Sequence, residues 1–67
     1  MRLKELREDK DITQSELATM LHIKQNTYSQ YENYHREIPI SILIKLARFY
    51  NVSIDYILEE TDNPKRY

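Results

Sequence analysis

Residues 13–32 read TQSELATMLHIKQNTYSQYE, and this stretch decides the fold. Thr13 and Glu16 have the spacing of a capping box, in which the threonine side chain accepts from the backbone three residues on and the glutamate reaches back, so we predict a helix that begins directly after Thr13. Residues 22–24 are too few for a flexible loop, and a further helix is expected over about residues 25–33. The stretch therefore predicts two short helices held together by a tight turn.

The second of these helices has two different faces. On a wheel of about 100° per residue, five polar side chains fall within an arc of roughly 140°, and Tyr28 and Tyr31 fall opposite. No carboxylate occurs between Leu17 and Tyr31 although charged residues make up 31% of the chain, and approach to phosphate requires such a surface. The amides of Gln and Asn match the adenine edge in the major groove. The predicted base-reading residues are Gln25, Asn26, Ser29 and Gln30.

The rest of the chain also has helical periodicity. Glycine is absent and apolar residues recur at spacings of three and four, so we expect an all-α protein with five helices in a compact bundle. The other three expected helices span about residues 1–9, 39–50 and 54–59, the last of them capped by Ser53. Residues 1–60 are expected to form one domain, and residues 61–67, which are polar and contain a proline, a flexible tail.

Size and composition limit the class of protein. A chain of 67 residues suffices for a single domain, and because it has no cysteine, neither a disulfide nor a thiolate metal site is available. His22 and His35 lack a partner at ligand spacing, so no metal is expected. No serine has a base and an acid at readable spacing, and we expect neither catalysis nor a cofactor. No apolar run approaches the about 18 residues of a membrane span, which favours a cytoplasmic protein with no membrane partner.

The charge distribution is more informative than the net charge of -1. That net charge argues mildly against nucleic acid, because most domains that bind it carry a basic excess. Residues 55–62, however, contain four acidic residues and no basic one, whereas basic residues exceed acidic ones in residues 17–49. We therefore expect a weakly positive surface around the middle helices.

The order of the motifs resembles the phage repressor and Cro family of helix-turn-helix domains, also called the XRE family. The matching segments are Arg7, residues 13–18, Ile23, residues 27–32, Ile38-Pro39, residues 45–47 and residues 51–55. The resemblance implies a lambda repressor-like DNA-binding domain whose third helix enters the major groove of double-stranded DNA, commonly as a two-fold dimer on a pseudo-palindromic operator. We therefore expect a sequence-specific transcriptional regulator, and in particular a repressor.

The resemblance also implies roles for individual residues. Gln14, at the start of the second helix, matches a residue that binds phosphate through its side chain and the helix N-terminus. The other predicted phosphate contacts are Lys24, Thr27, Asn33 and Arg36. Arg7 and Glu32 match a partly buried ion pair between the first and third helices, which orients the third helix more than it stabilises the fold. His22 and Tyr34 stand where the family usually has glycine, so positive φ is a possibility to test at both positions.

The fourth expected helix is apolar on nearly every side, which is more than one face against a small core can use. The surplus residues that we predict to form a homodimer interface are Ile42, Phe49, Tyr50, Ile54 and Tyr56. Two alternatives stay open. One is an antitoxin or accessory DNA-binding protein whose apolar surface binds a second protein, and the other is a protein-interaction module that has kept the fold and lost DNA binding. The polar arc is also open to interpretation as a merely solvated face, although such a face would be expected to contain Glu and Lys.

Overall fold

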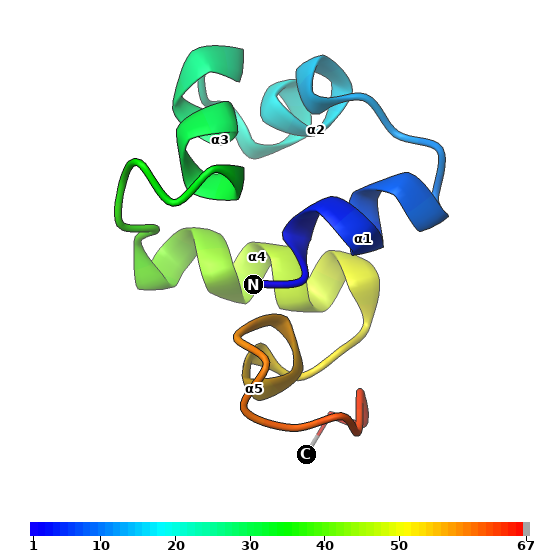
Figure 1. Ribbon diagram of the computed structural model, residues 1–67. Helices are drawn as coiled ribbons and strands as arrows, with labels where there is room; N and C mark the ends of the chain where they lie inside the picture. The colour runs from blue at the N-terminus through cyan, green and yellow to red at the C-terminus, as the bar shows by residue number, and fades with distance from the viewer. Residues whose placement is uncertain (67) are drawn as a thin grey trace.

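The computed structural model describes residues 1–66, and within them five α-helices follow one another (Figure 1). They are α1 (Leu3–Asp9), α2 (Gln14–Leu21), α3 (Gln25–Glu32), α4 (Ile40–Tyr50) and α5 (Ile54–Ile57). No strand occurs in this part of the chain. The all-α class and the five helices expected from the periodicity are therefore confirmed.

Short-range side-chain hydrogen bonds cap the starts of α2 and α5. Thr13 Oγ1 accepts from the Glu16 N–H at 3.1 Å and the Glu16 carboxylate accepts from the Thr13 N–H at 3.2 Å, so the predicted capping box starts α2. The Ser53 hydroxyl caps α5 in the same way, accepting a backbone N–H at 3.0 Å. α5 ends at Ile57, earlier than expected, because Glu59 takes a positive φ of 66° that stops the helix.

Each of the five helices in residues 1–66 is followed within two residues by left-handed backbone without the help of glycine. His22 ends α2 with a φ of 58°, Asn51 ends α4 with a φ of 56°, and Tyr34 follows α3 with a φ of 60°. His22 and Tyr34, the two residues that stand where the family usually has glycine, therefore both have positive φ. A residue with a Cβ is less stable in this conformation by about 1 kcal/mol or more, and Asn tolerates it best.

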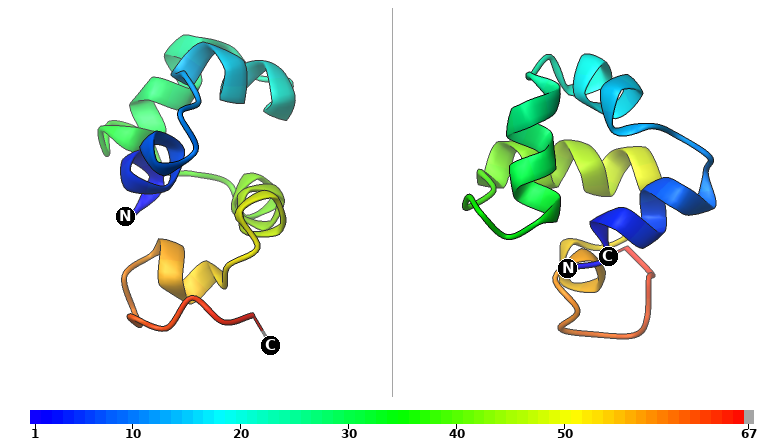
Figure 2. Two further views of the ribbon diagram at one scale, coloured as in Figure 1. Left: turned by 90° about the vertical axis from the view of Figure 1, so that its right-hand side faces the viewer. Right: turned by 45° about the horizontal axis from the view of Figure 1, so that its top comes forward.

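α4 crosses the middle of the molecule and is covered on two sides. Figures 1 and 2 show α2 and α3 on one side of α4 and α5 on the other. All five helices contribute to one apolar core. Its buried members are Leu3, Leu17, Ala18, Leu21, Tyr28, Tyr31, Ile42, Leu43, Leu46, Ala47, Tyr50, Val52 and Ile57. With 67 residues, a single such core at the centre of the bundle must supply most of the stability.

The segment after α5 folds back against the bundle. Arg2 donates to the Asp62 carboxylate at 2.8 Å, and the Ser53 N–H donates to the carbonyl of Pro64 at 3.0 Å. These bonds connect the end of the described chain to residues before α1 and α5. That residues 61–67 form a flexible tail stays a prediction, and the last residue of the chain lies outside the described part.

Candidate nucleic-acid interface

α3 buries its tyrosines and turns its amide side chains outward. Tyr28 and Tyr31 are 0% and 4% exposed, which confirms that the side of α3 opposite the polar arc is buried. Of the four predicted base-reading residues, two are exposed in the first turn of α3 and two are partly exposed one turn later: Gln25 and Asn26, then Ser29 and Gln30. The structure therefore brings the four together on one accessible surface, and their reading of bases stays a prediction.

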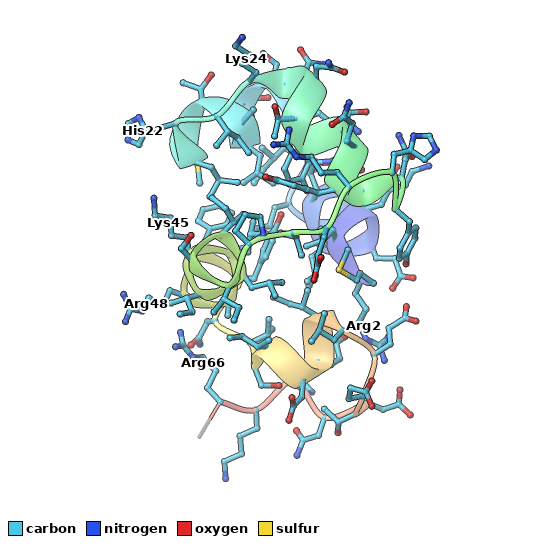
Figure 3. All side chains as sticks on the ribbon, turned by 90° about the vertical axis from the view of Figure 1, so that its left-hand side faces the viewer. Arg2, His22, Lys24, Lys45, Arg48 and Arg66 are labelled. Carbon is cyan, nitrogen blue, oxygen red and sulfur yellow. The ribbon has the colours of Figure 1, made fainter. Side chains whose placement is uncertain are left out.

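The turn between α2 and α3 is joined to the end of α2 by backbone hydrogen bonds. The Ile23 N–H donates to the Ala18 carbonyl at 3.0 Å, and the His22 N–H donates to the Thr19 carbonyl at 3.1 Å. Lys24 then takes an extended conformation and starts α3, without a side-chain cap on the first N–H groups. These groups point out of the helix end and favour an anion. The exposed Lys24 ammonium, at the top of Figure 3, adds positive charge beside them.

The other predicted phosphate contacts are spread along α2, α3 and the loop after it. Gln14 is the first residue of α2, where free N–H groups and the helix dipole favour an anion. Thr27 is partly buried on α3, and Arg36 is exposed in the loop that follows. Asn33 ends α3, and its amide donates to Ser29 Oγ at 3.3 Å. Their contact with phosphate stays a prediction.

Arg7 and Glu32 form an ion pair between α1 and α3. Arg7 Nε donates to Glu32 Oε2 at 2.7 Å and Nη2 donates to Oε1 at 3.3 Å, with side-chain exposures of 13% and 2%. Burial acts to raise the pKa of the Glu32 carboxyl, but the hydrogen bonds to it, led by those from Arg7, outweigh burial and hold the pKa below its ordinary value. The hydrogen bond to Glu32 likewise raises the pKa of Arg7. Both groups therefore stay charged at neutral pH.

Gln14 also belongs to this cluster, which the sequence did not indicate. Its Nε2 donates to Glu32 Oε1 at 3.2 Å, and Arg7 Nη1 donates to the Ile12 carbonyl at 2.8 Å in the link between α1 and α2. One buried carboxylate thus joins α1, α2 and α3. No spacing rule finds a contact between Gln14 and Glu32, because 18 residues and a turn separate them.

Two residues of the predicted dimer interface lie in the core of the single chain, so little of their surface is open to a partner. Ile42 and Tyr50 are each 7% exposed, because α4 is covered on two sides and buries a wider face than a surface helix does. Phe49 is 37% exposed, and Ile54 and Tyr56 are partly exposed, so these three stay candidates. The large apolar side chains that the prediction missed are Met20, Tyr34, Ile40 and Leu58, all exposed.

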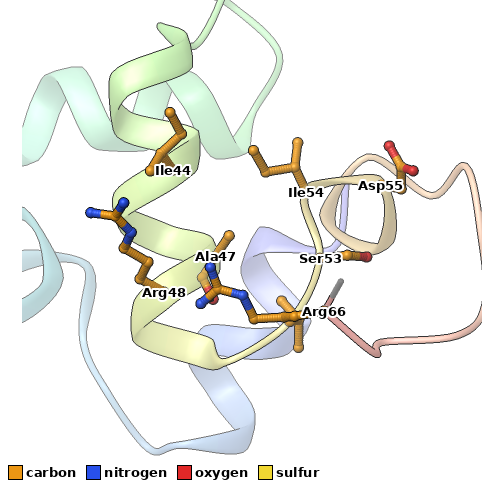
Figure 4. Close-up of a pocket in the computed structure, with 8 residues that line it drawn as sticks. Ile44, Ala47, Arg48, Ser53, Ile54, Asp55 and Arg66 are labelled. Atoms are coloured by element: carbon orange, nitrogen blue, oxygen red, sulfur yellow. The ribbon is translucent and has the colours of Figure 1, made fainter.

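A hollow of about 320 Å³ lies between α4 and the start of α5 (Figure 4). Its lining residues are Ile44, Ala47, Arg48, Val52, Ser53, Ile54, Asp55 and Arg66. The hollow therefore combines an apolar wall with two arginines and one carboxylate. In Figure 3, Arg48 and Arg66 project to the left together with Lys45, whereas Lys24 projects at the top. Positive charge is thus found on α4 and at the end of the described chain as well as beside α3.

Two other kinds of site are missing from residues 1–66. No group of three His, Asp or Glu residues there could hold a metal ion. The longest helix in this part, α4, has 11 residues, and none is long and apolar enough to cross a bilayer.

Comparison with known proteins identifies the arrangement of α2 and α3. Residues 3–57 match the family model described as helix-turn-helix. The chain is 42% identical over 65 residues to the HTH-type transcriptional regulator ImmR of Bacillus subtilis (strain 168), covering 97% of this chain and 51% of that protein. It is 41% identical over 63 residues to the uncharacterized HTH-type transcriptional regulator YobD of the same organism, covering 94% of this chain and 56% of YobD.

A relative from a second organism also matches. The chain is 30% identical over 61 residues to the cryptic phage CTXphi transcriptional repressor RstR of Vibrio cholerae, covering 91% of this chain and 55% of that protein. The chain thus spans about half the length of the curated relatives it matches. No solved structure matches it.

Proposed function

This chain belongs to the helix-turn-helix family of transcriptional regulators, which are not enzymes, and we propose that it binds double-stranded DNA at specific sequences and regulates transcription from there. In this proposal α3 enters the major groove, and Gln25, Asn26, Ser29 and Gln30 contact base edges. Gln14, Lys24, Thr27, Asn33 and Arg36 contact phosphates and set the position of α3 on the duplex.

One observation carries the proposal, which is the division of α3 into a buried tyrosine face and an accessible amide face without a carboxylate. Tyr28 and Tyr31 anchor α3 in the core, so the outward side chains are presented from a fixed backbone. A merely solvated helix face in a chain with 31% charged residues would be expected to carry Glu and Lys. Amides on a fixed helix instead suit the paired donor and acceptor of a base edge.

The distribution of charge supports the same orientation on DNA. The exposed Lys24 lies at the start of α3, whereas the exposed Asp55, Glu59 and Glu60 lie on or after α5, on the other side of α4. DNA phosphates attract the first region and repel the second. The net charge of -1 is therefore compatible with binding through α2 and α3.

We propose a homodimer on a pseudo-palindromic operator, in which two copies of α3 lie one DNA turn apart. Phe49, Ile54 and Tyr56 are the predicted interface residues that keep accessible surface. Repression by occupation of the operator is the expected mode, since the relative RstR is a transcriptional repressor. The proposed place of action is the bacterial cytoplasm, where the operator DNA lies.

Selection of bound duplexes from a random library tests the proposal, followed by titration of the selected duplex against a scrambled one at rising salt. We expect enrichment of one motif and a linear fall of log K with log salt, because phosphate contacts release counterions. A chain that enriches no motif and has no salt-dependent affinity for duplex DNA would refute the proposal and favour a protein-interaction module.

A further inference from the structure

The Gln14 amide at the start of α2 and the Glu32 carboxylate at the end of α3 meet beside the Arg7 guanidinium of α1. We propose that Glu32 is a positioning residue for DNA binding, which holds the Gln14 side chain so that an N–H of its amide points to a DNA phosphate. This inference rests on the proposed function, in which Gln14 contacts phosphate. It assigns to Glu32 a role beyond its ion pair with Arg7.

The chemistry of the two groups determines how the Gln14 amide is turned. An ionised carboxylate only accepts hydrogen bonds, so the amide must face Glu32 Oε1 with its nitrogen, and Nε2 does so at 3.2 Å. The amide nitrogen carries two hydrogens, and the second is free to donate to another acceptor. In the proposal, a phosphate beside the start of α2 accepts from this second N–H. If the amide turned over, its carbonyl oxygen would face both Glu32 and the phosphate, and both contacts would be repulsive.

The ion pair with Arg7 makes this arrangement compatible with a polyanion. A lone carboxylate beside Gln14 would repel the phosphate that the amide is to bind. Arg7 donates two hydrogen bonds to Glu32, so the charge of the carboxylate is compensated at a distance of 2.7 Å while one oxygen still accepts from Gln14. The pKa of Glu32 lies below its ordinary value, which keeps the acceptor ionised at neutral pH.

Gln14 is placed where an anion has access. It is partly exposed, and it lines an open hollow together with Arg7, Thr13 and Gln25. The hollow therefore lies between the end of α1, the start of α2 and the start of α3. Glu8 and Asp11 also line this hollow, so donors that face the anion in a fixed direction matter more here than net charge does.

A double-mutant cycle on DNA affinity tests the coupling between Gln14 and Glu32. The variants are Gln14→Met, Glu32→Gln and the double variant, and the probe is a duplex of arbitrary sequence at low salt, since phosphate contacts do not depend on sequence. In Glu32→Gln the single carboxamide oxygen at position 32 accepts from Arg7, and the amide nitrogen faces Gln14. The Gln14 amide therefore loses its acceptor. Leu46→Val is the control for destabilisation alone, because Leu46 is fully buried in α4 and its side chain cannot hydrogen-bond to Arg7, Gln14 or Glu32.

We expect Gln14→Met to lower the affinity about tenfold, as for a hydrogen bond to a charged group. Glu32→Gln should lower the affinity about two- to tenfold when Gln14 is present, because the affinity gained by restraining one long side chain is lost. In the Gln14→Met background, the additional Glu32→Gln substitution should not change the affinity further. Leu46→Val should lower the denaturation midpoint and leave the affinity of the folded protein unchanged. Equal losses from Glu32→Gln in both backgrounds, or no loss in either, would overturn the proposal.

NMR of the free protein separates this proposal from the proposed function. The two side-chain N–H signals of Gln14 should be distinct and slow to exchange with water in the wild type, and averaged in Glu32→Gln. A wild type without these held signals overturns the positioning role even if it binds DNA. A wild type with held signals but no affinity for duplex DNA refutes the proposed function, and the positioning role for DNA is overturned with it.

Discussion

Replacement of Arg7 by alanine tests how α3 is held, because it leaves the Glu32 carboxylate buried without its cation. Glu32 keeps one donor, the Gln14 amide at 3.2 Å, and its side chain is only 2% exposed. The variant also removes the bond from Arg7 to the Ile12 carbonyl, which joins α1 to the start of α2. Arg36→Ala is a matched control, since Arg36 is an exposed arginine.

The expected loss follows from these contacts. Removing one partner of a fully buried ion pair costs about 3–5 kcal/mol, and because Arg7 itself is 13% exposed and Gln14 still donates to Glu32, we expect a smaller loss of about 2–3 kcal/mol. A chain of this length has a free energy of unfolding of about 3–10 kcal/mol in total. Arg7→Ala therefore removes a large part of the stability, whereas Arg36→Ala should stay within about 0.5 kcal/mol.

The pH dependence of this loss has a definite sign. In the wild type the pKa of Glu32 is lowered, so its contribution to stability is present above the unfolded-state pKa of about 4.3 and is lost as the pH falls through the lower folded-state pKa. Without Arg7, the strongest of the contacts that lower the pKa of Glu32 is gone while burial remains, so this pKa rises relative to the wild type and less stability is lost as the pH falls. The difference between wild type and variant should therefore be smaller at about pH 4.5 than at about pH 7.

Urea titrations followed by circular dichroism at the two pH values measure both effects. We expect a lower midpoint for Arg7→Ala at neutral pH and a smaller difference at acidic pH, with Arg36→Ala like the wild type at both. An unchanged midpoint at neutral pH, or a difference that grows on acidification, would refute the reasoning about the Arg7–Glu32 pair.

Three further predictions concern base reading, backbone strain and assembly. Gln25→Ala and Gln30→Ala should each weaken binding to the selected duplex by about 1–3 kcal/mol and leave affinity for random duplex nearly unchanged; equal losses on both DNAs in a titration would exclude base reading. His22→Gly should raise the free energy of unfolding by about 0.5–1 kcal/mol, because glycine adopts a φ of 58° without steric cost; a urea midpoint no higher than that of His22→Ala would contradict this. Phe49→Glu should abolish the dimer on a palindromic duplex in sedimentation experiments, and a variant that assembles like the wild type would remove Phe49 from the interface.

The parts of the fold that the sequence predicted depend on interactions between residues close in sequence. The capping box of Thr13 and Glu16 joins residues three apart, and the start of α2 follows from it. The burial of Tyr28 and Tyr31 follows from the 3.6-residue period of α3. The positive φ of His22 occurs where the related domains usually have glycine, in a three-residue turn that restricts the backbone.

The parts that the sequence did not predict depend on contacts between distant segments. Ile42 and Tyr50 looked like surplus surface, because the pattern of α4 alone does not say that α5 covers its second side. The hydrogen bond between Gln14 and Glu32 requires the tertiary arrangement of α2 and α3. Periodicity gives the width of an apolar face, and only packing shows how much of that width is used inside one chain.

The difference between local and long-range contacts also explains how α3 can present side chains for recognition. Its residues include Asn, Thr, Ser and two Tyr, which are weak helix formers, so α3 is not stable through its own propensity. It is held by contacts on its inner side, namely the two buried tyrosines and the ion pair of Glu32 with Arg7. Because α3 is held by its inner side, the amides on its outer side are positioned by the fold but are not needed for its stability. Substitutions of the outer residues should therefore act on DNA affinity, and substitutions of the inner ones on stability first.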